Sequence, residues 1–148
     1  MKRSNYISWD DFFMGVAELA SKRSKDPRTQ HGACIINENN RIIGVGYNGL
    51  PDGCSDDEYS WERAEKHKYV IHAEVNAVLN ATKNLENATL YLFSERGLYP
   101  CGECAKIIVQ SGIRTVVLKY IGENLEERYN GSELKKLFST VGGKIRSL

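Results

Sequence analysis

The sequence predicts an α/β protein, built as a three-layer α/β/α sandwich around a five-stranded mixed sheet. The first observation is that short apolar segments of strand length alternate with segments of helical periodicity. The second is that a helix separates the last two predicted strands, so these strands are expected to be parallel to each other. At 148 residues, the chain has the size of one domain, 1–148, with a sizeable core.

The opening part of the chain predicts one helix and a β-hairpin. Apolar residues recur on one face from Trp9 to Ser24, which indicates an amphipathic helix, and Asp26-Pro27 ends it. Two apolar segments follow, Gly32–Ile36 and Arg41–Tyr47, and both are predicted to be strands. Asn37-Glu38-Asn39-Asn40 lies between them and is typical of a hairpin connection.

The middle of the chain predicts a polar connection, a helix and a strand. The segment from Asn48 to Lys68 is polar, with glycine and proline breaks early and a short helix expected at Trp61–Lys68. A longer helix is expected at Tyr69–Lys83, and a strand at Ala88–Phe93.

The last third predicts a parallel crossover and a final helix–strand pair. Cys101–Ser111 is expected to be a helix that Gly112 terminates, and Arg114–Lys119 the strand after it. With the preceding strand, these elements form a crossover that should be right-handed. Ser132–Thr140 is expected to be a helix with Ser132 as its N-cap, followed by a short strand at Gly143–Leu148.

Composition excludes several classes of function. Twenty basic and nineteen acidic side chains give a formal net charge of +1, which argues against a protein that binds nucleic-acid phosphates over a broad surface. No apolar run has the length of a membrane span, and no signal peptide is recognisable, so we expect a cytoplasmic protein. Its four cysteines are then expected to be metal ligands or free thiols.

Two short motifs carry the chemistry. His72-Ala73-Glu74 and Pro100-Cys101-Gly102-Glu103-Cys104 together offer one imidazole and two thiolates. Three protein ligands leave the fourth tetrahedral position open, which is typical of a catalytic zinc that activates water. Glu74 is not needed as a ligand and is the natural proton carrier. This pattern is that of the zinc-dependent nucleobase deaminases.

The predicted helices place these residues suitably. Cys101 and Cys104 fall in the N-terminal turn of a helix, where the positive end of the helix dipole lowers the pKa of a thiol. Their i, i+3 spacing places both sulfurs on one face. His72 is expected in the first turn of the preceding helix. We also expect burial near an apolar wall to raise the pKa of Glu74.

The cysteines and histidines allow other interpretations. A single Cys-x-x-Cys also occurs in redox dithiols and in halves of zinc ribbons, but a ribbon needs a second such pair, and a redox dithiol leaves His72 and Glu74 unexplained. Cys34, Cys54 and His67 are candidates for a second, structural zinc site, although their spacing matches no standard zinc finger. The simpler expectation for Cys34 is a buried, inert thiol on a strand.

Beyond these motifs, the chain resembles the deoxycytidylate (dCMP) deaminase family of the cytidine-deaminase-like superfamily. The zinc motif is common to the superfamily, whereas the arginine-serine-lysine-aspartate-proline run and the tyrosine-asparagine-glycine segment are similar to the dCMP branch. The residues that carry the resemblance are Trp9, Phe12-Phe13-Met14, Ala17, Arg23-Ser24-Lys25-Asp26-Pro27, Thr29-Gln30, Gly32-Ala33-Cys34-Ile35, Gly46–Cys54, His72–Ala77 and Pro100–Lys106.

The resemblance implies hydrolytic deamination of dCMP to dUMP and a set of substrate contacts. It implies that Asn48 hydrogen-bonds the sugar and that Ser24 and Arg23 lie near the 5′-phosphate. Ala73 and Tyr120 complete the expected substrate-binding residues.

The resemblance also implies regulation and assembly. A site for an activating dCTP, with Mg²⁺ on the triphosphate, and for an inhibiting dTTP is implied near a loop with these residues: Gly46, Tyr47, Asn48, Gly49 and Gly53. A homo-oligomer, often a hexamer, is implied as well.

The Gly44-x-Gly46-x-x-Gly49 spacing also matches a dinucleotide-binding pattern, but Pro51 and Gly53 follow where that pattern needs a helix.

Two features depart from the family pattern. The connection Phe93–Tyr99 is about four residues longer than usual, and its Ser94, Glu95, Arg96 and Gly97 are candidates for reshaping the pocket rim. His31 stands where an apolar residue is expected, and is interpreted as a hydrogen-bonded residue at a strand start in preference to a phosphate contact. Trp61, Tyr59 and Tyr69 are interpreted either as a cover for the base or as ordinary core residues.

Three competing functions remain open at this point. A tRNA adenosine deaminase shares the zinc motif but must hold a polynucleotide and flip a base, which calls for a basic surface that this chain lacks. A binding-only relative should have lost a ligand or the proton carrier, yet all four residues are present. A deaminase that acts on dCTP, as well as or instead of dCMP, fits the same motifs.

Overall fold

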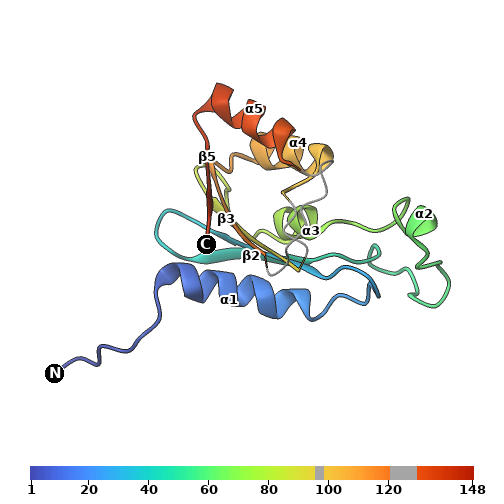
Figure 1. Ribbon diagram of the computed structural model, residues 1–148, viewed down its shortest axis with the longest axis horizontal. Helices are drawn as coiled ribbons and strands as arrows, with labels where there is room; N and C mark the ends of the chain where they lie inside the picture. The colour runs from blue at the N-terminus through green and yellow to red at the C-terminus, as the bar shows by residue number, and fades with distance from the viewer. Residues whose placement is uncertain (96–98, 121–129) are drawn as a thin grey trace.

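The computed structural model describes residues 1–95, 99–120 and 130–148 (Figure 1). These residues form one five-stranded sheet in the order β2-β1-β3-β4-β5. The helices are α1 (Trp9–Ser21), α2 (Arg63–Lys66), α3 (Ala73–Leu79), α4 (Gly102–Ser111) and α5 (Ser132–Val141). The strands are β1 (His31–Ile36), β2 (Ile42–Tyr47), β3 (Thr89–Ser94), β4 (Thr115–Tyr120) and β5 (Lys144–Ser147).

The sheet is mixed, as the sequence predicts. Strand β1 pairs antiparallel with both β2 and β3, whereas β3 with β4 and β4 with β5 are parallel. The hairpin between β1 and β2 is fixed by Asn37, whose side-chain Oδ1 accepts hydrogen bonds from the backbone N–H groups of Asn39 and Arg41. Asn40 takes the left-handed conformation, which asparagine tolerates better than most residues. The expected fold class, including the parallel last two strands, is therefore confirmed.

Helices cover both faces of the sheet. Helix α1 lies on one face, and α3, α4 and α5 lie on the other (Figure 1). Alternation along β1 divides its side chains between the two layers: Cys34 and Ile36 face α1, whereas Ala33 and Ile35 belong to the core under the other three helices. The segment that carries α2 projects away from the layered part of the molecule (Figure 1).

Gly46 allows α3 to lie directly on strand β2. A Cβ atom at this position would lie 2.6 Å from the carbonyl oxygen of Ala73 and still closer to the backbone nitrogen of Ala77. Any side chain here would therefore push α3, and His72 at its start, away from the sheet. The close packing of α3 on β2 therefore requires glycine at position 46. Gly46 does not belong to the lining of the pocket described below.

Two helices are shorter than the sequence predicts. Helix α1 ends at Ser21, after which the N–H groups of Lys22, Arg23 and Ser24 close short turns back onto the helix. Helix α3 begins at Ala73, because Ile71 forms an antiparallel bridge with Gly49 and is extended. Apolar periodicity does not reveal this bridge, since its two partners are far apart in the sequence.

Other boundaries also differ. Helix α5 begins at Ser132, but its N-cap is Gly131 in a left-handed conformation, so the expected capping role of Ser132 is wrong. Helix α2 is limited to four residues within the expected range. None of the helices in the described part of the chain has both the length and the apolar character needed to cross a membrane.

Candidate active site

His72, Cys101 and Cys104 meet in one cluster at the starts of two helices. His72 is the N-cap of α3, Cys101 is the N-cap of α4, and Cys104 lies in the first turn of α4. Nδ1 of His72 lies 3.5 Å from Sγ of Cys101 and 3.3 Å from Sγ of Cys104. Among residues 1–95, 99–120 and 130–148, these are the only three His, Cys, Asp or Glu side chains that come together closely enough to hold a metal ion.

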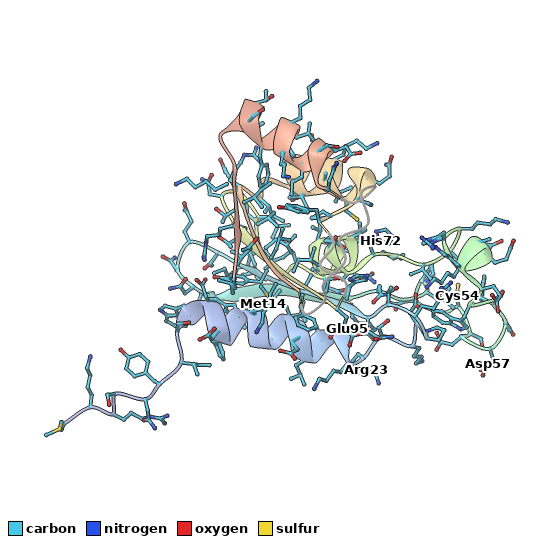
Figure 2. All side chains as sticks on the ribbon, in the orientation of Figure 1. Met14, Arg23, Cys54, Asp57, His72 and Glu95 are labelled. Carbon is cyan, nitrogen blue, oxygen red and sulfur yellow. The ribbon has the colours of Figure 1, made fainter. Side chains whose placement is uncertain are left out.

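Local structure determines this arrangement. Pro100 is buried and directs the chain into α4, and Cys101 has the extended φ and ψ of an N-cap residue. His72 has the same backbone conformation before α3, just after the bridge at Ile71. The predicted placement of the two cysteines at a helix N-terminus is confirmed, and His72 lies one residue before its helix. Figure 2 shows His72 beside α3, between the sheet and the upper helices.

The contacts within the cluster shift the pKa values of Cys101, His72 and Cys104 in different directions. Hydrogen bonds from the Cys104 thiol and from His72 lower the pKa of Cys101 to about 3, against the opposing effect of burial. The hydrogen bond with Cys101 in turn raises the pKa of His72 to about 8. The same contact with Cys101, together with burial, raises the pKa of Cys104. Cys101 is therefore a thiolate that faces a protonated His72 and the Cys104 thiol, and a bound cation could replace these protons.

This donor set fits a zinc ion. Zinc–sulfur bonds of about 2.3 Å and zinc–nitrogen bonds of about 2.0 Å, at a tetrahedral angle, place sulfur and nitrogen about 3.5 Å apart. The two observed sulfur–nitrogen distances, 3.5 and 3.3 Å, agree with that spacing. Thiolate and imidazole are also the ligand types that zinc prefers.

Glu74 lies beside the cluster in the first turn of α3. Its side chain is only 6% exposed, and burial raises its pKa, as predicted. A hydrogen bond with Cys104 connects its carboxyl group to the cluster. A raised pKa makes a carboxyl group a better proton acceptor, and a proton shuttle requires a group that both accepts and releases a proton.

A pocket of about 200 Å³ lies at the end of β2. Its lining includes five of the residues expected to contact substrate or effector: Arg23, Tyr47, Asn48, Gly49 and Gly53. The remaining lining residues are Lys25, Leu50, Pro51, Asp52, Cys54, Asp56 and Trp61. The cluster residues are not part of this lining, but Gly49 in the wall is bridged to Ile71, which directly precedes His72. In Figure 2, Arg23 lies at the end of α1 and Cys54 on the projecting segment.

Asn48 and Ser24 form the floor between the pocket and the sheet. Asn48 is 3% exposed; its Oδ1 accepts from the N–H of His31 at 2.9 Å, and its Nδ2 donates to the carbonyl of Thr29 at 2.9 Å. The Ser24 hydroxyl donates to the Asn48 carbonyl at 2.9 Å. Both side chains therefore support the backbone around the pocket. A sugar contact by Asn48 would use its remaining donor and acceptor capacity.

Two cations face this pocket from the loop after α1. The Arg23 guanidinium lies over the Tyr47 ring, 5.9 Å from its centroid, and the Lys25 ammonium pairs with Asp56. The carboxylates of Asp52 and Asp56 also line the pocket, so a phosphate group entering here would meet two cations and two acidic side chains.

Other predicted residues lie away from this pocket. Ala73, the first residue of α3, is fully buried in the core. Tyr120 ends β4, and its side chain lies outside the described part of the chain, as do Arg96 and Gly97 of the predicted rim. Cys34 is fully buried, as expected, and burial raises its pKa to about 12, which disfavours the reactive thiolate.

Cys34, Cys54 and His67, the candidates for a second zinc site, form no such group among the described residues. Tyr59 and Tyr69 contact each other edge to face, with ring centroids 5.1 Å apart, and Trp61 donates from Nε1 to the Asp56 carbonyl. Of these three aromatic residues, only Trp61 lines the pocket. Sequence reasoning did not identify Lys66, which lies buried against Asp26. A lysine in a polar segment looks like a surface charge, so the sequence offers no signal for this pair.

A sheet of this topology, with a His-x-Glu and a Pro-Cys-x-x-Cys motif joined at two helix starts, defines the class of zinc-dependent nucleobase deaminases. Comparison with known families identifies the family within this class. Residues 7–120 match the family model for the cytidine and deoxycytidylate deaminase zinc-binding region. The chain belongs to the cytidine and deoxycytidylate deaminase family, and is therefore a hydrolase.

Relatives of similar length support this assignment. The deoxycytidylate deaminase of Homo sapiens is 40% identical, over 98% of this chain and 82% of that protein. The deoxycytidylate deaminase of Mus musculus is 43% identical over the same shares. Among solved structures, the dCMP deaminase of cyanophage S-TIM5 in complex with dCMP and dUMP superposes with a TM-score of 0.70 at 25% identity, over 93% of this chain and 95% of that one.

Proposed function

We propose that this protein catalyses the hydrolytic deamination of dCMP to dUMP, with a zinc ion held by His72, Cys101 and Cys104. The observation that carries the proposal is the cluster of these three side chains with the buried Glu74 carboxyl group beside it. Support for the substrate comes from the deoxycytidylate deaminases at about 40% identity and from the cyanophage enzyme that binds dCMP and dUMP.

The chain's own residues can supply the proton transfers. A zinc ion at the cluster would act as a Lewis acid that makes water nucleophilic near neutral pH. Glu74 accepts a proton from the attacking water and delivers protons to the ring nitrogen and to the departing amino group, which leaves as ammonia. The carbon–nitrogen bond breaks and a carbonyl replaces the amine, so water and dCMP become dUMP and ammonia. Burial of Glu74 excludes bulk water from competing for these protons.

The pocket at the end of β2 would bind the rest of the nucleotide. Arg23 and Lys25 provide two cations from one loop for the 5′-phosphate. Asn48 lies at the floor between this loop and the Gly49–Ile71 bridge, a suitable place for a contact to the sugar. Because Asp52 and Asp56 also line the pocket, a phosphate there would have to contact Arg23 and replace Asp56 as the partner of Lys25.

Deamination across a panel of substrates tests this specificity. With dCMP, CMP, deoxycytidine and dCTP at equal concentrations, we expect the highest kcat/KM for dCMP, because Arg23 and Lys25 can bind a phosphate group that deoxycytidine lacks. Ammonia release or the absorbance change of the base measures the rate. A preference for dCTP would identify the triphosphate as substrate. Comparable activity on tRNA or single-stranded DNA would favour the polynucleotide alternative.

We further propose regulation by deoxynucleoside triphosphates at the outer wall of the same pocket, around Tyr47, Gly49 and Gly53. The support is a physical connection: the Tyr47 ring lies under the Arg23 guanidinium, so an effector that moves Tyr47 also moves a cation expected to bind substrate phosphate. The effector must bind the active arrangement more tightly than the inactive one, because equal affinity for both shifts nothing. The hexamer implied by the family resemblance stays a prediction.

Rate curves against dCMP test this regulation. We expect a sigmoidal curve that dCTP with Mg²⁺ makes hyperbolic and that dTTP makes more sigmoidal, with a coupling of about 1–3 kcal/mol. Tyr47→Ala should flatten both responses and leave the metal content unchanged, since Tyr47 is not one of the three residues of the cluster. A parent enzyme with hyperbolic kinetics that neither triphosphate alters would contradict the proposal and make dCTP the first alternative substrate to assay.

A further inference from the structure

A buried ion pair joins α2 to the loop that follows α1. Lys66 Nζ lies 2.8 Å from Oδ1 and 2.7 Å from Oδ2 of Asp26, and the two side chains are 5% and 2% exposed. By contrast, both partners of the Lys25–Asp56 and Arg146–Asp10 pairs remain partly exposed. Two charges are stable inside a protein only when they are paired and hydrogen-bonded, so the contact between Lys66 and Asp26 constrains both segments strongly.

Asp26 shapes its own loop as well as binding Lys66. Its Oδ1 accepts from the backbone N–H groups of Arg28 at 2.8 Å and Thr29 at 3.2 Å, which fixes a turn after Pro27. Burial alone would raise the pKa of Asp26, but the hydrogen bonds from Lys66 and from these two N–H groups outweigh it and lower the pKa. The group is therefore a carboxylate whose charge is compensated by α2 and by its own turn.

The turn after Pro27 is hydrogen-bonded to Asn48 at the floor of the pocket. The carbonyl of Thr29 accepts from Asn48 Nδ2, and the Ser24 hydroxyl both donates to the Asn48 carbonyl and accepts from the N–H of Asp26. Arg23 and Lys25 belong to the same short loop and line the pocket. A displacement of Asp26 would therefore move both cations relative to Asn48.

The backbone of Lys66 is also hydrogen-bonded to the segment that precedes His72 of the metal cluster. Its carbonyl accepts from the N–H groups of Tyr69 and Val70, and the next residue, Ile71, exchanges two hydrogen bonds with Gly49, at 2.8 and 3.1 Å. His72 follows immediately. One residue thus connects the segment that enters the cluster with the loop that carries the cations.

We propose that Lys66 is a positioning residue that sets the phosphate-binding end of the site, by holding the Asp26 loop and its two cations at a fixed distance from the His72 segment. The inference rests on the proposed function and deepens it. Without Lys66, the Asp26 carboxylate would be buried and unpaired, and the loop would move so that water could reach it. The consequence is weaker binding of substrates that carry a 5′-phosphate, with little effect on substrates that lack it.

The variant that tests this is the double substitution Asp26→Asn with Lys66→Met. Lys66→Met alone leaves a buried unpaired carboxylate and is expected to fold poorly. In the double variant, the amide oxygen of the asparagine can still accept from the two turn N–H groups, and the methionine keeps much of the apolar stem of the lysine, so this variant should fold. We expect its KM for dCMP to rise about tenfold with kcat within about twofold, and its kcat/KM for deoxycytidine to stay near the parent value.

Competitive inhibition by dUMP and by deoxyuridine gives a second measurement, which does not depend on turnover of the nucleoside. The inhibition constant of dUMP should rise about as much as the KM for dCMP, and that of deoxyuridine should not change. Lys68→Met is the matched control, because Lys68 lies two residues away in an exposed pair with Glu65 and should leave all constants unchanged.

The outcomes separate the inference from the function it rests on. Equal losses for dCMP and deoxycytidine, or an unchanged preference for the phosphate, would overturn the positioning role while leaving dCMP deamination established for the parent. A parent protein that does not deaminate dCMP would instead reject the proposed function. A thermal unfolding curve near that of the parent shows that a selective loss is not a consequence of misfolding.

Discussion

The substitution Glu74→Gln is expected to preserve the fold and the metal content and to reduce kcat by about 10²–10⁴-fold, the usual contribution of general acid–base catalysis, or more. The amide has nearly the shape of the carboxyl group but cannot accept a proton from water. Because Glu74 is only 6% exposed, bulk water cannot readily replace it as a proton carrier. One group also serves several transfers in the same turnover, so its loss affects more than one step.

The measurement is single-turnover or steady-state kcat for dCMP, with zinc content and circular dichroism measured on the same sample. Glu103→Gln is a matched control: Glu103 lies in the same motif as the cysteines, but its side chain is 82% exposed and pairs with Lys106 on the surface of α4. This control should retain the activity of the parent. A kcat for Glu74→Gln within about tenfold of the parent would reject the assigned role.

The metal cluster was predictable because two of its three ligands lie close together in the sequence. Spacing of i, i+3 after a proline places Cys101 and Cys104 together whatever the rest of the fold does. His72 required one further step, the expectation that two helices on the same face of a sheet begin near each other. That expectation depends on the alternation of strands and helices, which the sequence shows clearly, and the structure places His72 within 3.5 Å of both sulfurs.

The pocket was less predictable, because long-range backbone contacts form it. The Gly49–Ile71 bridge straightens the segment before His72 and shortens α3, and no periodicity indicates it. The family resemblance groups Gly46 with the effector residues, yet its role in the structure is to let α3 approach β2. The buried Lys66–Asp26 pair joins residues forty positions apart, each of which would ordinarily be exposed. Such contacts follow from tertiary packing, which residue type alone does not reveal.

The second large effect is expected from loss of the metal. Protein purified without added zinc should contain about one zinc per chain, since the cluster offers three ligands at tetrahedral spacing. Exhaustive chelation should abolish deamination, and added zinc should restore it. Cys104→Ser should lower both the zinc content and the activity strongly, because a hydroxyl is a much weaker zinc ligand than a thiolate.

The control is Cys34→Ala, which removes the one buried thiol that lies on the other side of the sheet, under α1, and should leave the zinc content unchanged. Metal is measured by elemental analysis of the same preparations that are assayed for activity, so that a folding defect and a metal defect can be told apart. In Cys104→Ser, restoration of activity at high zinc concentration would show weakened affinity, as expected for a damaged ligand set that still folds. Full activity in a chelated, metal-free sample would overturn the metal assignment, and with it the reason for three such residues to meet at two helix starts.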